Sequence, residues 1–91
     1  MPLAVMFSPK SMNGDQYDDI IIRLAEVGAG APHGRLYHAC YGTGDSLHVF
    51  DVWDSQESFQ KFGQTLMPIL AEVGIDAGEP QINPTHSLIP G

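Results

Sequence analysis

The sequence predicts a single α+β domain over residues 1–91, in which a four-stranded antiparallel sheet carries two helices on one face. Three observations lead to this fold class. Two segments have the three-to-four-residue apolar spacing of amphipathic helices, the segments around them read as strands, and glycine or proline stands near most boundaries. A chain of 91 residues is also too short to bury much more than one layer of helices against a sheet.

The first strand is predicted over residues 3–8, a nearly continuous apolar run that ends at Pro9. Such a run is typical of a strand buried on both faces in the middle of a sheet. A helix follows, because Asn13 and Gln16 have the spacing of a capping box and acidic residues fill the first turns. Its apolar stripe, which we expect to face the sheet, consists of Tyr17, Ile20, Ile21, Leu24 and Val27.

Two strands are predicted at residues 35–41 and 46–54, joined by a tight turn over residues 42–45. This turn places Tyr41 opposite Ser46, and His38 opposite Val49. One face of the hairpin then carries Leu36, His38, Cys40, Leu47, Val49, Asp51 and Trp53. The other face carries Tyr37, Ala39, Tyr41, His48, Phe50 and Val52, and we expect it to form a barrel interior or dimer seam.

The second helix is predicted to begin at Asp54 or Ser55, to kink or restart at Pro68, and to end at Gly74. Its buried stripe consists of Phe59, Phe62, Leu66, Ile69 or Leu70, and Val73. The last strand is predicted over residues 79–89, where prolines confine it to a sheet edge or to an exchange between subunits. With right-handed crossovers, this order gives a ferredoxin-like βαββαβ subunit.

Charge, cysteine content and histidine spacing limit the classes of partner and the kinds of site that are expected. The net charge is −7 and the four basic residues are scattered, so binding to nucleic acid or to an anionic membrane is not expected. The single Cys40 excludes an internal disulfide, and no apolar run reaches spanning length, which favours a cytoplasmic protein. The histidines lack the spacing of a metal site, so no metal is expected; they are His33, His38, His48 and His86.

Three segments resemble the dimeric α+β barrel superfamily, and within it the antibiotic biosynthesis monooxygenase-like domain family. They are Asp51-Val52-Trp53-Asp54-Ser55, Glu57-Ser58-Phe59-Gln60-Lys61-Phe62 and Leu66-Met67-Pro68-Ile69-Leu70-Ala71-Glu72-Val73-Gly74-Ile75. The resemblance implies a homodimer whose two sheets close into one barrel, with a pocket in each subunit beside Trp53. It also implies oxidation of aromatic polyketides or quinols by molecular oxygen without a cofactor, or else binding and degradation of haem.

The chain lacks the polar residues that family members use for each of these two activities. Polyketide monooxygenases of this family have an Asn at the position of Val49, where its amide can orient a phenolic oxygen. Haem-degrading members have an Asn near the position of Phe7 and a His near Gly63 and Gln64. Haem degradation is therefore not expected, and we expect no cofactor.

His38 and Asp51 remain as candidate catalytic residues on the face that the resemblance assigns to the pocket. A carboxylate beside a histidine holds one tautomer and makes the ring a better general base for a phenolic or enolic substrate. Trp53 is the expected stacking wall, and Val49 and Phe62 are further candidate ligand contacts. The alternative is a non-catalytic dimeric structural or ligand-binding module. In that case His38 and Asp51 only satisfy each other's hydrogen-bonding groups, and Trp53 packs against the following helix.

Overall fold

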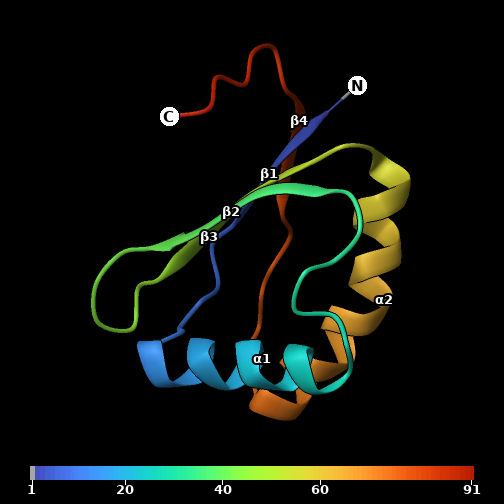
Figure 1. The fold of residues 1–91 in the computed structure, drawn as a ribbon. Coiled ribbons are helices and arrows are strands. Elements are labelled where there is room, and N and C mark those ends of the chain that lie inside the picture. The colour runs from blue at the N-terminus through green and yellow to red at the C-terminus, as the bar shows by residue number, and fades with distance from the viewer. Residues whose placement is uncertain (1) are drawn as a thin grey trace.

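The computed structural model describes residues 2–91. Its elements are β1 (Leu3–Phe7), α1 (Gly14–Glu26), β2 (Arg35–Tyr41), β3 (His48–Trp53), α2 (Gln56–Val73) and β4 (Gln81–Pro84). The strands form one antiparallel sheet in the order β2-β3-β1-β4. Both helices lie on one side of this sheet, and the last residues loop back on the other side (Figure 1). The ferredoxin-like α+β fold, with β1 inside the sheet and β4 at its edge, confirms the sequence prediction.

Side-chain caps fix where each helix begins. The Asn13 side chain accepts a hydrogen bond from the Gln16 N–H at 2.8 Å, and the Gln16 side chain accepts one from the Asn13 N–H at 2.9 Å, which confirms the predicted capping box. Ser55, rather than Asp54, caps α2 by accepting a hydrogen bond from the Ser58 N–H at 3.2 Å.

The helix α2 runs through Pro68 without restarting, contrary to one of the two expectations for this residue. Proline removes one backbone hydrogen bond from a helix, and the carbonyl group that loses its partner belongs to the residue four positions earlier, Gln64. Both residues are exposed, so water can satisfy that carbonyl group. Gly74 ends the helix with a φ of 83°, as predicted.

The register of the β2–β3 hairpin differs from the predicted one by two residues. Tyr41 pairs with His48, and His38 pairs with Asp51. Because side chains alternate with a period of two, a shift of two residues leaves the side chains of the regular pairs, from Tyr37 and Val52 onward, on their predicted faces. His38 and Asp51 therefore stay on the helix side, where they lie directly opposite each other instead of diagonally.

The shift has a tertiary cause in the connection between the strands. The Met12 N–H donates to the Asp45 carbonyl at 2.9 Å, and the Leu47 N–H donates to the Met12 carbonyl at 3.3 Å. These bonds hold residues 45–47 against the segment that leads into α1, so β3 starts at His48 and the connection is longer than a tight turn.

A β-bulge at the start of β2 also corrects the prediction for Leu36. Arg35 pairs with Trp53, and the next regular pair is Tyr37 with Val52, so Leu36 is the extra residue. Leu36 is 52% exposed and is not part of the buried face. Arg35 takes the helix-side position instead.

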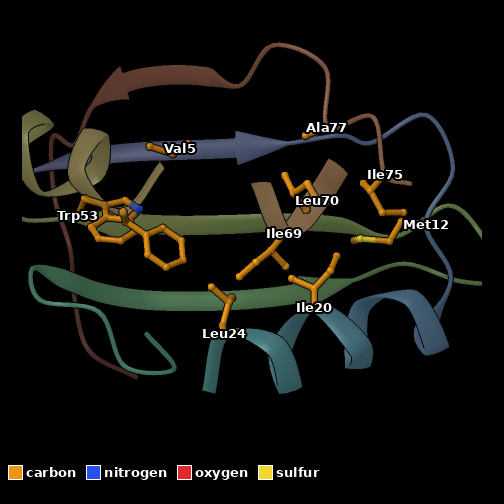
Figure 2. Packing of buried hydrophobic residues seen from close by; sticks show 10 residues of the cluster. Val5, Met12, Ile20, Leu24, Trp53, Ile69, Leu70, Ile75 and Ala77 are labelled. Atoms are coloured by element: carbon orange, nitrogen blue, oxygen red, sulfur yellow. The ribbon is translucent and has the colours of Figure 1, made fainter. Parts of the chain in front are cut away.

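The hydrophobic core fills the space between the sheet and the two helices (Figure 2). Trp53 and Val5 are fully buried on the two inner strands of the sheet, and Ile20 and Leu24 join the same core from α1. Val27, which the apolar stripe of the first helix includes, is instead 62% exposed because α1 ends at Glu26. The remaining large members of the core come from α2 and the loops: Met12, Phe62, Ile69, Leu70 and Ile75.

The opposite face of the sheet is apolar and only partly covered. Tyr37 packs its ring against Phe50, with centroids 6.2 Å apart, yet Tyr37 remains 51% exposed and Tyr41 47% exposed. The C-terminal residues 84–89 border a hollow on this face together with Phe50 and Val52. Within residues 2–91, neither helix has both the length and the apolar character needed to cross a membrane.

Candidate functional site

A small cavity lies between the helix-side face of the sheet and the two helices. Its volume is about 60 Å³, measured over the positions that the centre of a water-sized sphere can take. A water-sized sphere itself occupies only about 10–15 Å³, so the cavity has room for several waters. The lining is mostly apolar and comes from β1, β2, β3, both helices and the segments that flank them. Its polar members are Tyr17, Arg35, His38 and Asp51.

His38 and Asp51 form the buried end of a hydrogen-bonded chain. The Nδ1 atom of His38 lies 2.5 Å from the Oδ1 atom of Asp51, on the neighbouring strand. The Asp51 side chain is 4% exposed and that of His38 is 22% exposed. Burying a carboxyl group is costly unless a partner compensates it, and the imidazole of His38 supplies that partner.

Tyr17 forms the outer end of the same chain. Its hydroxyl oxygen lies 2.6 Å from Nε2 of His38, and the two rings are nearly parallel, with centroids 6.0 Å apart and an interplanar angle of 10°. One proton arrangement satisfies both bonds of the neutral ring. In it, Nδ1 of His38 donates to Asp51, and Nε2 accepts a hydrogen bond from the Tyr17 hydroxyl.

The sequence pattern does not reveal the contact between Tyr17 and His38, because the spacing of Tyr17 fits the apolar stripe of α1. One signal was available. The stripe is otherwise aliphatic, and a tyrosine that packs toward a core requires a hydrogen-bond partner for its hydroxyl group. The identity of that partner depends on how α1 crosses the sheet, which the helical spacing does not give.

Burial raises the pKa of the Tyr17 phenol above its ordinary value of 10.0. The neighbouring Cys40 and Asp51 act in the same direction, whereas the Arg35 guanidinium acts in the opposite one. Tyr17 is therefore a neutral phenol at physiological pH. A neutral phenol can both donate a hydrogen bond and accept one.

Arg35 supplies the positive charge of the cavity lining. The β-bulge turns it toward the helices, where its guanidinium carbon lies 5.9 Å from the centre of the Phe62 ring. Its Nη2 donates to the Gly30 carbonyl at 3.4 Å. A guanidinium so placed at the edge of an apolar cavity can stabilise an anion that forms inside it.

Trp53 does not have the position predicted for a ligand-stacking wall. It is fully buried, with its ring centroid 5.2 Å from that of Phe62 and 5.9 Å from that of Phe59. Among residues 2–91, the cavity lining does not include Trp53, and its Nε1 has no hydrogen-bond partner. The helix that follows β3 covers the ring, so Trp53 belongs to the core. The predicted contacts Val49 and Phe62 do border the cavity.

The other histidine of the hairpin lies away from this cavity. Nδ1 of His48 is 3.1 Å from Oγ of Ser8, and its ring packs against that of Tyr41, on the sheet face without helices. Over residues 2–91, no three His, Cys, Asp or Glu side chains come together in the manner of a metal site.

Comparison with solved structures places this geometry in a known fold. A candidate antibiotic biosynthesis monooxygenase from Chloroflexus aurantiacus J-10-fl matches over 100% of both chains, with a TM-score of 0.66 and 22% identity. The chain has the fold of the antibiotic biosynthesis monooxygenase-like proteins. SnoaB from Streptomyces nogalater, a cofactor-independent oxygenase, matches over 99% of this chain and 96% of its own, with a TM-score of 0.61 and 16% identity.

The same fold occurs in proteins without an assigned activity. NE2512 from Nitrosomonas europaea, a protein of unknown function, matches over 99% of this chain and 95% of its own, with a TM-score of 0.64 and 16% identity. In sequence comparisons, neither a protein-family model nor a curated protein matches the chain. The antibiotic biosynthesis monooxygenase-like fold therefore does not decide the chemistry, which has to be argued from the cavity.

Proposed function

We propose that the protein is a small-molecule enzyme that removes a proton from a phenolic or enolic hydroxyl group in the cavity between sheet and helices. The observation that carries the proposal is the chain Asp51–His38–Tyr17, which is buried at one end and borders an apolar cavity at the other. His38 is the base that ends with the proton, and Asp51 holds its ring and compensates the charge. An apolar cavity strengthens each of these electrostatic interactions.

The anion formed by this step is electron-rich and can react with molecular oxygen. SnoaB, which shares the fold, is a cofactor-independent oxygenase. By analogy, we propose that a phenol and O₂ give a quinone and water. One oxygen atom becomes the new carbonyl oxygen, and the other leaves as water with the hydroxyl hydrogen and the hydrogen of the oxidised ring carbon.

The size of the cavity supports a small substrate. A cavity of about 60 Å³ that has room for only several waters favours a ligand no larger than one aromatic ring. We therefore propose a single-ring phenol, quinol or enol, rather than a fused polycyclic compound. Val49 stands where polyketide monooxygenases of the family have an Asn, so the cavity has no amide group at that position. Substrate orientation then depends on Tyr17 and Arg35.

We also propose that the working form is a homodimer. The sheet face opposite the helices exposes Tyr37 and Tyr41 beside Phe50, and a monomer would leave these aromatic rings in water. A second copy that packs the same face would bury them and close the two sheets into a barrel.

Oxygen consumption with a panel of single-ring phenols and hydroquinones tests the enzymatic function. We expect panel members to raise the melting temperature of the wild-type protein and to be oxidised. His38→Gln should lower turnover about 100-fold, since positioned general bases contribute at least that much. His48→Gln, on the other face of the sheet, is the matched control and should leave turnover unchanged.

Two results would contradict the proposal. Oxidation that survives His38→Gln would remove His38 as the base. Binding by the wild-type protein without any oxygen consumption would favour the alternative, a non-catalytic ligand-binding module.

A further inference from the structure

We propose that Tyr17, rather than His38, is the residue that contacts the substrate hydroxyl group and passes its proton on to His38. This inference rests on the proposed function, since it concerns the same proton transfer. It adds a catalytic residue to the site and reduces His38 to a base that acts through another side chain.

Both ring nitrogens of His38 already have partners. Nδ1 is engaged with Asp51 at 2.5 Å, and Nε2 is engaged with the Tyr17 hydroxyl at 2.6 Å. A base accepts a proton at a nitrogen whose lone pair faces the donor, and the hydroxyl group of Tyr17 occupies that direction. A substrate therefore has to displace Tyr17 or act through it.

Tyr17 has the properties that a relay needs. It lines the cavity together with His38, and a phenol oxygen that donates to Nε2 still has lone pairs with which to accept a hydrogen bond from a substrate. The rings of Tyr17 and His38 are nearly parallel, with an interplanar angle of 10°, and they meet through the hydroxyl group and Nε2. Displacing Tyr17 would break this hydrogen bond.

The proton step balances without any further reactant. The O–H bond of the substrate breaks as a new O–H bond forms on Tyr17, and the original O–H bond of Tyr17 breaks as an N–H bond forms at Nε2 of His38. The products are a substrate oxyanion, a neutral Tyr17 and an imidazolium paired with Asp51. Tyr17 then donates a hydrogen bond to the oxyanion through its new O–H group.

The charged and titratable groups around Tyr17 fit this exchange. Its pKa is raised by burial and by Cys40, Asp51 and Asp18, and lowered by Arg35, so it neither loses its proton at rest nor keeps a negative charge afterwards. Arg35 is close enough to act on the Tyr17 oxygen, and the substrate oxyanion forms next to that oxygen. The site therefore favours a substrate that enters neutral and becomes an anion.

The test uses para-nitrophenol, a single-ring phenol whose ionised form absorbs visible light and whose neutral form does not. At a pH below the pKa of the free probe, binding to the wild-type protein should raise the visible band. Tyr17→Phe should still bind the probe. Its affinity should stay within about tenfold of the wild-type affinity, because only one neutral hydrogen bond is lost. The ratio of ionised to neutral bound probe should fall at least tenfold, which corresponds to one pKa unit.

Tyr37→Phe is the matched control, because it removes a tyrosine hydroxyl group from the other face of the sheet. It should leave both the affinity and the visible band unchanged. An equally ionised bound probe in Tyr17→Phe would overturn the relay and leave the proposed function standing, with His38 as the direct base. A wild-type protein that binds no probe would overturn the proposed function for single-ring phenols, and the relay with it.

Nitrogen NMR of His38 in the ligand-free protein supplies a second, substrate-independent readout. The relay requires that the neutral ring carry its proton on Nδ1 and that the Nε2 resonance move when Tyr17 is changed to Phe. A neutral ring protonated on Nε2 in the wild-type protein would overturn it, because Nε2 could not then accept a proton from Tyr17.

Discussion

The carboxyl group of Asp51 and the imidazole of His38 lie directly opposite each other on β3 and β2, with Oδ1 2.5 Å from Nδ1. Removing the imidazole leaves a carboxyl group that is almost completely buried without its partner. We expect His38→Ala to lower the free energy of unfolding by about 3 kcal/mol, as for other broken buried pairs. Asp51→Asn keeps a hydrogen-bonding group beside the ring and should cost less. Urea unfolding of both variants measures the difference.

The double variant His38→Ala, Asp51→Asn separates the lost packing from the unpaired carboxyl group. If the buried carboxyl group causes the loss, the double variant should be more stable than His38→Ala alone. A double variant whose losses simply add would show that the two side chains are not coupled.

The outline of this pair could be predicted, and its geometry could not. Strand alternation puts His38 and Asp51 on one face whatever the register, because a slip by two residues preserves faces. The direct pairing depends on Met12, whose backbone holds the connection between β2 and β3. A contact between segments that are distant in the sequence cannot be predicted from the spacing of apolar and turn residues within either segment. The same holds for the contact of Tyr17 with His38.

The position of Trp53 in the core leads to a second prediction. Trp53→Phe should lower stability by about 1–3 kcal/mol, because the smaller ring leaves a gap beside Phe59 and Phe62. It should leave ligand affinity within about twofold, because Trp53 does not border the cavity in the described structure. Calorimetric titration with para-nitrophenol measures the affinity, and thermal unfolding measures the stability. A large loss of affinity in a folded variant would restore Trp53 to the binding site.

Replacing Gly34 with alanine should destabilise the protein more than the same change at Gly44, which serves as the matched control. Gly34 has a φ of 89°, and a Cβ atom there would lie 2.5 Å from Cβ of Ser58 and 2.6 Å from Oδ1 of Asp54. Gly44 has a φ of 59° with open space around it. Gly44→Ala should therefore cost only the backbone strain, about 1 kcal/mol, whereas Gly34→Ala should cost clearly more because the start of α2 must shift.

Denaturant unfolding of the two glycine variants decides this point. Equal losses would mean that the segment before β2 moves aside freely. In that case the close contact between Gly34 and the start of α2 would not help to fix Arg35, which directly follows it in the chain.

The exposed aromatic face predicts which substitution should break the proposed homodimer. Tyr41→Glu places a charge on the sheet face without helices, where a second copy would have to bury it, so the variant should be a monomer. Ile22→Glu is the control, because Ile22 is 58% exposed on α1 and lies on the other side of the molecule. Light scattering at micromolar concentration gives the mass of each. A wild-type monomer would contradict the proposed assembly. A dimeric Tyr41→Glu variant would show that the dimer interface lies on another face of the molecule.

Cys40 predicts a pH dependence whose sign follows from its surroundings. Burial, and next the charge of Asp18, raise the pKa of the Cys40 thiol above its ordinary value of 9.0. The thiolate is the reactive form, so iodoacetamide should alkylate Cys40 more slowly in the folded protein than in urea, and the rate should rise only at higher pH. Because the folded state favours the neutral thiol, its contribution to stability is present below pH 9 and is lost as the pH rises through the raised pKa. Cys40→Ser should remove that decline, and equal alkylation rates with and without urea would contradict the burial of the thiol.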